Sequence, residues 1–210
     1  MRLLIILLLM VGLQAAEEAK WQSLFDGKTL TGWETAKKTP VAKGWIAEDG
    51  CIFRNAKGGS IFTVSEYENF ELEFEWKISA NGNSGVKYRT NGQLGPEYQV
   101  LDDDGHKNGK NPLTSAAALY AMVSCNDQKA LKPVGEFNTG RIVAHGTKLE
   151  HWLNGKKVME TDTSSAEWAK AKASSKYRDK EDYGTGSGRL MLQDHGNLAW
   201  YRNLRIRPLD

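Results

Sequence analysis

The sequence predicts an all-β protein, an antiparallel β-sandwich with one short helix late in the chain. Short stretches of alternating apolar and polar residues recur along the chain, and turn residues separate them. The regular alternation of strands with helices that a parallel sheet requires is not seen. We find no internal repeat and no low-complexity linker, so the pattern predicts a single domain.

The first residues, 1–16, match a secretory signal peptide. Arg2 is followed by an apolar run and then by small residues at Ala15 and Ala16. The apolar run is too short to span a membrane. We therefore expect cleavage at this point and a mature domain over 17–210 that is secreted or periplasmic.

The charge balance argues against two kinds of partner. The chain has 28 Lys and Arg against 26 Asp and Glu, and no basic patch stands out. Neither nucleic acid nor an anionic membrane is therefore expected to bind. Cys51 and Cys125 could pair in an oxidising compartment, but no spacing motif joins them, and two buried free thiols are the default expectation.

The clearest strand covers 70–78, with the sequence FELEFEWKI. Its apolar residues alternate strictly with Glu71, Glu73, Glu75 and Lys77, a period of two that no helix would keep on one side. Three carboxylates in a row could form a catalytic array, but such a row more often marks a solvated outer face. Shorter strands are expected before it, at 44–46, 51–54 and 60–63.

The residues from 81 to 106 predict a β-hairpin whose strands cover 84–90 and 96–101. Because strand residues alternate between faces, one face is apolar and is expected to join the core. That face holds Val86, Tyr88, Tyr98 and Val100. The opposite face holds Lys87, Arg89, Glu97 and Gln99. These four polar residues form either an exposed cross-strand salt bridge or part of a site.

The second half of the chain supplies further strands and the helix. Asn154-Gly155 is the turn of a hairpin that follows a strand pair over 137–144 and 148–153. The segment 113–124 suits either a helix or a buried strand. A helix is expected over 164–178, because Ser164 or Ser165 can cap it. Strands at 189–194 and 200–207 follow, and in the first of them Met191, Gln193 and His195 would face away from the core.

Several motifs taken together resemble one protein family. They are GNSGVKYR, PEYQVLDD, GEFNTGRIVAHGTKLEHWLNGKKV, and GRLMLQDHG followed by YRNLRIR. The family is the bacterial secreted 3-keto-disaccharide hydrolase domain, long known as a domain of unknown function, and the resemblance covers about Trp21 to Arg207. It implies a concanavalin A-like jelly roll with a ligand on its concave outer sheet face.

The resemblance also implies a substrate, a glycoside whose C3 hydroxyl a partner oxidoreductase has already oxidised to a ketone. A C3 ketone acidifies the C2 proton, so a base can remove it and the enolate can expel the C1 aglycone. Addition of water to the resulting enone completes a net hydrolysis. Such a site needs a base near C2, an acid near the leaving oxygen, and donors or a cation at the enolate oxygen.

Glu97 and His195 match the family's motifs on the expected non-core faces of their strands, so we expect them to transfer protons. Donors to the ketone, the enolate and the sugar hydroxyls are expected from Lys87, Arg89, Gln99 and Gln193. Asp102 and His151 are further substrate-binding candidates, although a bulge would have to turn Asp102 toward the site. His151 is more often structural in such a position. The residues indicate no particular cofactor, but a divalent metal held by His195 and carboxylates would be an alternative stabiliser of the enolate.

Two other functions compete with this interpretation. Retaining β-glucanases share the fold but carry the string E-x-D-x-x-E, which does not occur here. Their mechanism also needs two carboxyl groups about 5–5.5 Å apart, and Glu97 has no evident second carboxylate. The other candidate is a non-catalytic, lectin-like carbohydrate-binding module. A sheet face dominated by exposed Trp would favour that module.

Overall fold

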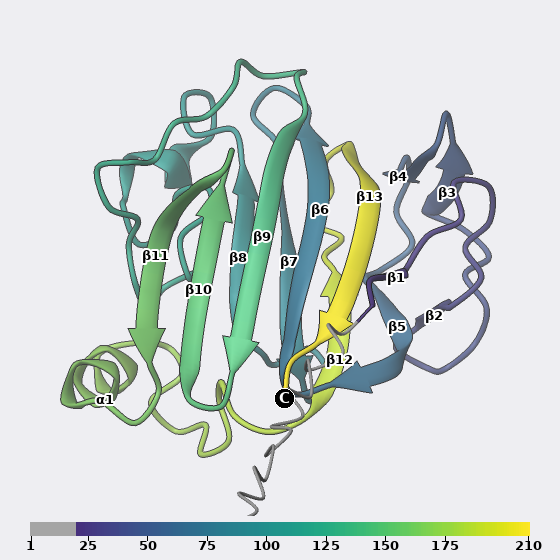
Figure 1. Ribbon diagram of the computed structural model, residues 1–210. Coiled ribbons are helices and arrows are strands. Elements are labelled where there is room, and N and C mark those ends of the chain that lie inside the picture. Colours follow the sequence, from purple (N-terminus) through teal and green to yellow (C-terminus); the bar gives the residue numbers. More distant parts are fainter. Residues whose placement is uncertain (1–19) are drawn as a thin grey trace, which may run out of the picture.

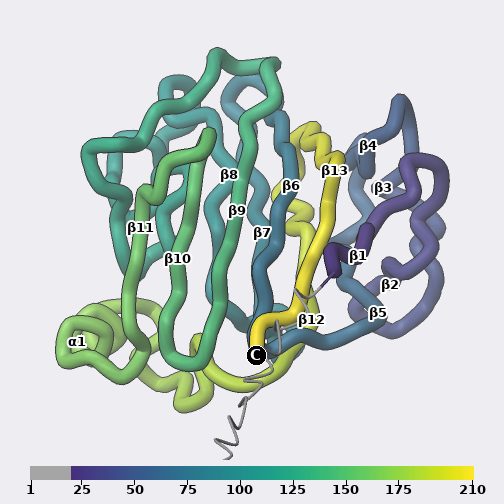
Figure 2. The backbone as a smooth tube through the Cα atoms, in the orientation of Figure 1, coloured from purple at the N-terminus to yellow at the C-terminus, as the bar shows by residue number. Residues whose placement is uncertain are grey.

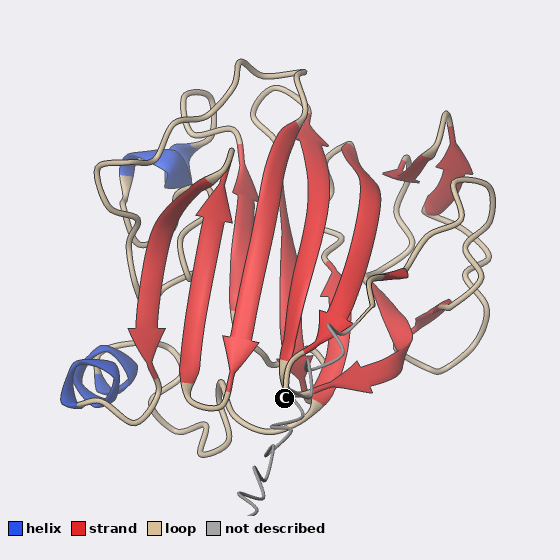
Figure 3. Ribbon diagram, in the orientation of Figure 1, coloured by secondary structure: helices blue, strands red, loops and turns tan. Residues whose placement is uncertain are grey.

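The computed structural model describes residues 20–210, whose regular elements are all strands apart from one α-helix and one short 3-10 helix. Two antiparallel sheets pack face to face (Figures 1 and 3), as the sequence predicts. The predicted signal peptide, 1–16, lies outside the described residues. Within 20–210, no helix is both long and apolar enough to cross a membrane.

The first sheet has eight strands and is the nearer one in Figure 1. Its spatial order is β11-β10-β9-β6-β13-β4-β3, with β1 paired to β13. The strands are β1 (Gln22–Ser23), β3 (Trp45–Glu48), β4 (Cys51–Arg54), β6 (Phe70–Ile78), β9 (Asn138–His145), β10 (Lys148–Leu153), β11 (Lys156–Asp162) and β13 (Ala199–Pro208).

The second sheet has five strands, in the order β2-β5-β12-β7-β8. They are β2 (Trp33–Thr35), β5 (Ile61–Tyr67), β7 (Asn83–Thr90), β8 (Glu97–Leu101) and β12 (Gly188–Leu192). The strands β7 and β8 form the predicted hairpin, in which Lys87 is the register partner of Glu97. Because β12 pairs with β7, the last part of the chain lies beside this hairpin.

The core lies between the two sheets and follows the predicted alternation. The inward residues of β6, β7 and β8 are all buried there: Phe70, Leu72, Phe74, Trp76, Ile78, Val86, Tyr88, Tyr98 and Val100. Aromatic edge-to-face contacts join the sheets, with the ring centroids of Phe74 and Tyr98 5.3 Å apart. The apolar face predicted for the hairpin is therefore confirmed.

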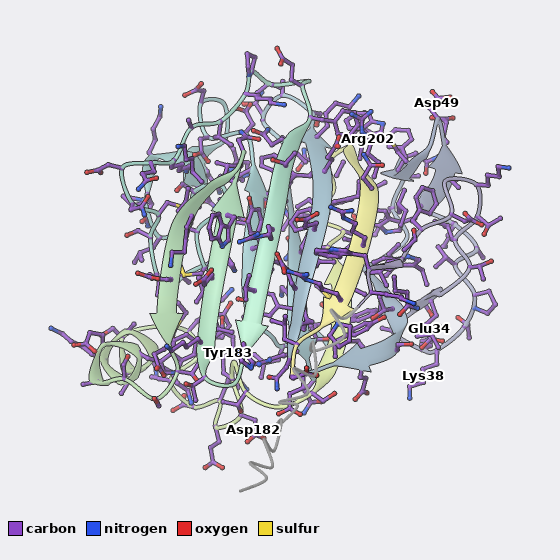
Figure 4. All side chains as sticks on the ribbon, in the orientation of Figure 1. Glu34, Lys38, Asp49, Asp182, Tyr183 and Arg202 are labelled. Carbon is purple, nitrogen blue, oxygen red and sulfur yellow. The ribbon has the colours of Figure 1, made fainter. Side chains whose placement is uncertain are left out.

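The three glutamates of β6 lie on the outer face of the first sheet, and each is paired with an arginine of β13. Glu71 contacts Arg207, Glu73 contacts Arg205, and Glu75 contacts Arg202 at 2.7 Å. Figure 4 labels Arg202 at the upper end of β13. This ladder of ion pairs confirms that the carboxylates mark an outer face.

Irregular segments connect the strands, and one of them borders the second sheet. The segment 113–124 is neither helix nor regular strand; it consists of turns whose backbone pairs with β8 through the bridge between Tyr98 and Leu119. The helix α1 (Ala166–Ala173) is shorter than the predicted 164–178, because the chain turns after Ala173 (Figure 2). A short 3-10 helix, η1 (Lys107–Lys110), was not expected.

Both cysteines are free thiols, which agrees with the default expectation. Cys51 is buried in β4, whereas Cys125 follows the irregular segment and is partly buried. Burial raises the pKa of the Cys125 thiol to about 11, so it stays protonated near neutral pH.

Candidate active site

A row of side chains crosses the outer face of the second sheet from edge to edge. Register pairs between neighbouring strands define it. Its members, in order, are Glu34, Phe62, Met191, Lys87 and Glu97. Leu190 and Leu192 point into the core while Met191 does not, so the face predicted for β12 is confirmed. The row ends with a charged pair, Lys87 on β7 and Glu97 on β8.

Glu97 is the buried acid of this row, with only 2% of its surface exposed. Lys87 Nζ lies 3.4 Å from Glu97 Oε2. Gly85, on the neighbouring strand, leaves the space that the carboxylate uses, because a Cβ there would lie 2.6 Å from Oε1. Burial raises the pKa of Glu97 above its usual value, while the charges of Lys87, Lys176 and His195 oppose the shift. Glu97 is therefore a stronger base than an exposed carboxylate.

Lys176 approaches the carboxylate from outside the sheet. Its Nζ lies 4.3 Å from the ring centroid of Tyr120 and 5.1 Å from that of Tyr177. Tyr120 belongs to the irregular segment beside β8, where its backbone N–H donates to the Glu97 carbonyl oxygen at 3.0 Å. Partial burial lowers the pKa of Lys176, and the charge of Glu97 opposes that shift. Glu97 thus has ammonium groups from two different elements near it.

Two stacked tyrosines form the wall behind Lys176. The rings of Tyr177 and Tyr183 lie 3.9 Å apart at 14°, and Trp168 of α1 stacks on Tyr183 in turn. Figure 4 labels Tyr183 near the lower end of β10. Neither tyrosine hydroxyl has a hydrogen-bond partner among the described residues, although both are buried. Burial raises the pKa of both phenols, and the nearby charge of Glu97 adds to the effect.

The residues after β12 bring His195 to the rim of the site. The Gln193 backbone N–H donates to the Gly85 carbonyl oxygen at 2.9 Å, which keeps this segment beside β7. Asp194 fixes the turn, since it pairs with Arg54 at 2.8 Å and accepts the N–H groups of Gly58 and Gly59. His195 itself is exposed. Its imidazole can therefore exchange protons with solvent while contributing to the field at Glu97.

Gln99 and Gln193 are placed near Glu97, each with an unused acceptor. Gln99 is fully buried, and its Nε2 donates to the Thr114 carbonyl oxygen at 3.0 Å, because the irregular segment covers β8. The Oε1 atoms of Gln99 and Gln193 have no partner within the described chain. A buried polar atom without a partner costs about 1–3 kcal/mol, and such atoms often gather where a ligand supplies the missing bond.

Arg89 does not share the face of Lys87, contrary to the alternation. Its φ of 47° turns the backbone, and β12 shifts register against β7 at the same place. The guanidinium instead donates to the carbonyl oxygens of Glu68, Gly146 and Gly184. Arg89 therefore ties three loops together, and the sequence-based prediction of its face was wrong because a bulge interrupts the period of two.

His151 and Asp102 also lie away from the carboxylate of Glu97. His151 is fully buried between the sheets, with Nε2 3.0 Å from the Tyr88 hydroxyl and Nδ1 2.9 Å from the Ala117 carbonyl oxygen. Asp102 accepts the backbone N–H groups of Asn81, Asp104 and Gly105, so it organises the loop after β8. Both contact sets are structural, and the structure does not bring either residue to the site.

The donor set around Glu97 does not suit a divalent metal. Among residues 20–210, no three His, Cys, Asp or Glu side chains come together in an arrangement that could hold a metal ion. The groups that face Glu97 are ammonium ions and phenols, and ammonium groups repel a cation. The predicted alternative of a metal held by His195 is therefore not supported by the residues present.

The site combines a buried base, two cations and an exposed imidazole on one sheet face. Sequence reasoning found Glu97, Lys87, Gln193 and His195 there, because strand alternation placed them. It missed Lys176 and the three tyrosines, which lie on irregular segments where no period exists. The single aromatic residue beside Lys176 in SSKYRD, Tyr177, was a local signal, but a weak one.

Comparisons with known proteins agree with this fold and show the family. Residues 20–207 match the family model of the 3-keto-alpha-glucoside-1,2-lyase-like domain. A 3-keto-disaccharide hydrolase of Bacteroides thetaiotaomicron is 34% identical, with 90% of this chain and 78% of that protein covered. A crystal structure of a candidate glycosyl hydrolase from Parabacteroides distasonis is 35% identical with a TM-score of 0.82, and the match covers 90% of this chain and 94% of that one.

A more distant structure shows the fold alone. The carbohydrate-binding module CBM66 of Bacillus subtilis has a TM-score of 0.54 at 16% identity, over 84% of this chain and 96% of the module. The family match over residues 20–207 and the relatives at 34% and 35% identity decide the assignment. The chain belongs to the family of 3-keto-alpha-glucoside-1,2-lyase-like domains, and it is an enzyme of the glycoside hydrolase type.

Proposed function

We propose that this enzyme cleaves the glycosidic bond of 3-keto-glycosides, with a 3-keto-disaccharide as the preferred class of substrate. The observation that carries the proposal is Glu97, a buried carboxylate with raised pKa that faces the ammonium groups of Lys87 and Lys176. A base of this kind suits removal of a carbon-bound proton, and adjacent cations suit the negative charge that forms. The relative from Bacteroides thetaiotaomicron carries the name of this activity.

The first step is removal of the C2 proton by Glu97. The C–H electron pair moves into the C2–C3 bond, and the C3 ketone oxygen becomes an enolate oxygen. Lys87 and Lys176 stabilise that oxygen, since both ammonium groups act on the same buried region. A positioned base contributes on the order of 10²–10⁴-fold, so the cations supply much of the remaining acceleration.

The second step breaks the glycosidic bond. The enolate collapses, a C1–C2 double bond forms, and the C1 oxygen leaves with a proton from His195. Water then adds at C1 of the enone and gives a proton back to His195, while protonated Glu97 returns a proton to C2. The products are the free aglycone and the free 3-keto-sugar, a net hydrolysis.

The proposal also names a partner enzyme and a cellular location. The substrate requires an oxidoreductase that makes the C3 ketone, and that enzyme is the expected functional partner. The sequence of residues 1–16 supports export, so we place the mature protein in the periplasm or outside the cell.

A binding-only module is disfavoured, because the row on the sheet face that includes Glu97 contains no tryptophan.

The test compares 3-keto-trehalose with trehalose as substrates of the purified protein, with glucose release measured in EDTA and with added Mn²⁺, Ca²⁺ or Zn²⁺. We expect release from 3-keto-trehalose alone, and no loss of activity in EDTA. Glu97→Gln is the inactive control. The proposal is wrong if no 3-keto-glucoside is cleaved under any of these conditions.

A further inference from the structure

The outer face of the first sheet carries a groove that the proposed chemistry does not use. Its volume is about 760 Å³, and it lies across β13, β6, β9 and β10. Trp21 and Trp152 both line it. We call it the Trp21–Trp152 groove. It lies on the opposite side of the sandwich from Glu97, whose side chain projects from the outer face of the second sheet.

The groove has a regular floor. Register pairs place Arg205 opposite Glu73, Glu73 opposite Arg141, and Arg141 opposite Trp152. Neighbouring strands lie about 4.8 Å apart, so this row spans about 14 Å from β13 to β10. Trp21 lies at the β13 end and Trp152 at the β10 end. The floor is thus an Arg–Glu–Arg row with an indole at each end, long enough for more than one sugar ring.

Arginines hold both indoles in place. The guanidinium carbon of Arg141 lies 3.9 Å from the ring centroid of Trp152, and that of Arg205 lies 4.6 Å from the ring of Trp21. The Trp152 Nε1–H also donates to Glu150 at 2.8 Å. A rigid aromatic side chain loses little conformational entropy on binding, so these contacts favour the indoles as ligand platforms.

The charges of the floor are paired within the protein. Arg205 Nε donates to Glu73 at 2.8 Å, and Arg141 contacts Glu71 at 2.9 Å. The side chains remain accessible, with exposed fractions of 52% for Arg205, 32% for Arg141 and 31% for Glu73. Paired ions attract another ion weakly, yet their N–H groups and oxygens can still bond hydroxyls.

We infer that the Trp21–Trp152 groove is a second, non-catalytic site that binds a neutral glycan chain. A pyranose has an apolar C–H face that packs on an indole, and its equatorial hydroxyls meet paired donors and acceptors. An aromatic groove with a few oriented polar groups has this complementarity. Binding here would hold the enzyme on a polymeric glycan while the opposite face acts on a small substrate.

The test is native gel electrophoresis of the mature protein in gels that contain xyloglucan, galactomannan, pullulan or polygalacturonate. We expect retardation by at least one of the three neutral polysaccharides. Trp152→Ala should weaken that retardation at least fivefold. Thr139→Arg should do the same, because Thr139 is an exposed residue of the groove and the substitution blocks it without disturbing the core.

The controls separate this site from the catalytic face. Glu97→Gln should be retarded like the wild type, and Trp152→Ala should keep wild-type turnover of 3-keto-trehalose. Trp200→Ala is the matched control on the same sheet, since Trp200 stacks on Phe53 and does not line the groove. The inference is overturned if no neutral glycan retards the wild type, or if polygalacturonate alone retards it. It is also overturned if Trp152→Ala and Thr139→Arg are retarded by the neutral glycan as strongly as the wild type.

Discussion

Lys87 Nζ lies 3.4 Å from Glu97 Oε2 across the β7–β8 register pair, in a region where the carboxylate is almost fully buried. Burial raises the pKa of Glu97, and Lys87 is the first of the charges that oppose the shift. The pair therefore sets the pH at which Glu97 becomes a base.

Lys87→Met should move the acid limb of the pH profile for kcat/KM to higher pH. Glu97 is active when ionised, so activity falls as pH falls through its pKa, which already lies above 4.5. Loss of the ammonium group raises that pKa further. The measurement is the pH dependence of kcat/KM on 3-keto-trehalose. Lys157→Met, which removes an ion pair of the first sheet, is the control. An acid limb that does not move in Lys87→Met would refute the role of the Lys87–Glu97 pair.

Gly85→Ala should reduce kcat with the fold intact. The new Cβ would lie 2.6 Å from Glu97 Oε1, so the carboxylate must move away from its position. Because a misplacement of about 1 Å costs about a hundredfold in rate, we expect a fall of that order. Circular dichroism would check the fold. Gly50→Asn, in an open turn, is the control. Full activity in Gly85→Ala would show that the position of the Glu97 carboxylate is not critical.

His195→Ala should lower turnover by about a hundredfold, the range of a positioned acid. The imidazole is exposed at the rim, so added imidazole should reach the vacant position and restore part of the activity. Turnover of 3-keto-trehalose with and without imidazole measures this. His106→Ala is the matched control, because His106 caps η1 through Nδ1. Wild-type turnover in His195→Ala would assign proton donation to another group, with Lys176 the next to test.

His151 should make the protein sensitive to acid. Burial lowers its pKa to about 3, although its bond to Ala117 opposes the shift, whereas the unfolded imidazole titrates near 6.5. The unfolded state therefore binds the proton first, and the free energy of unfolding should fall as pH falls from 6.5 toward 3. The slope is up to about 1.4 kcal/mol per pH unit.

Urea unfolding between pH 4 and pH 7 measures this slope. His151→Gln should flatten it, while Tyr88→Phe removes one hydrogen bond of His151 but keeps the imidazole, and should retain it. An equal slope in His151→Gln and wild type would contradict the assignment. A folded His151→Gln should also keep its KM for 3-keto-trehalose, since His151 lies between the sheets rather than at the site.

Local patterns predicted the parts of the site that depend on one strand. The period of two in β7 and β8 placed Lys87 and Glu97 together, and the same alternation, continued past the end of β12, placed Gln193 and His195 outside the core. Arg89 was misplaced because its bulge depends on pairing with β12, about a hundred residues later. That register cannot be read from the hairpin sequence.

The second limit on prediction from the sequence was that distant segments bury residues of the strands. Gln99 was expected to line an open face, but residues 113–124 pair with β8 and cover it. Lys176 reaches Glu97 because Tyr120 and Tyr177 flank it, and these two rings come from segments more than fifty residues apart. Such contacts depend on the path that irregular segments take between strands. Neither hydrophobic periodicity nor secondary-structure propensity predicts that path.

The central claim is that Glu97 removes the C2 proton before the glycosidic bond breaks. The most direct measurement follows 3-keto-trehalose that carries deuterium at C2, with mass spectrometry of the released 3-keto-glucose. Incubation with Glu97→Gln corrects for exchange without catalysis. The proposed mechanism predicts that cleavage is slower than with the protonated substrate, because the C2–D bond breaks. It also predicts that the product loses the C2 deuterium to the extent that Glu97 exchanges the abstracted deuteron with solvent before it returns a proton. A product that retains the label, formed at an unchanged rate, would show direct hydrolysis and contradict the mechanism.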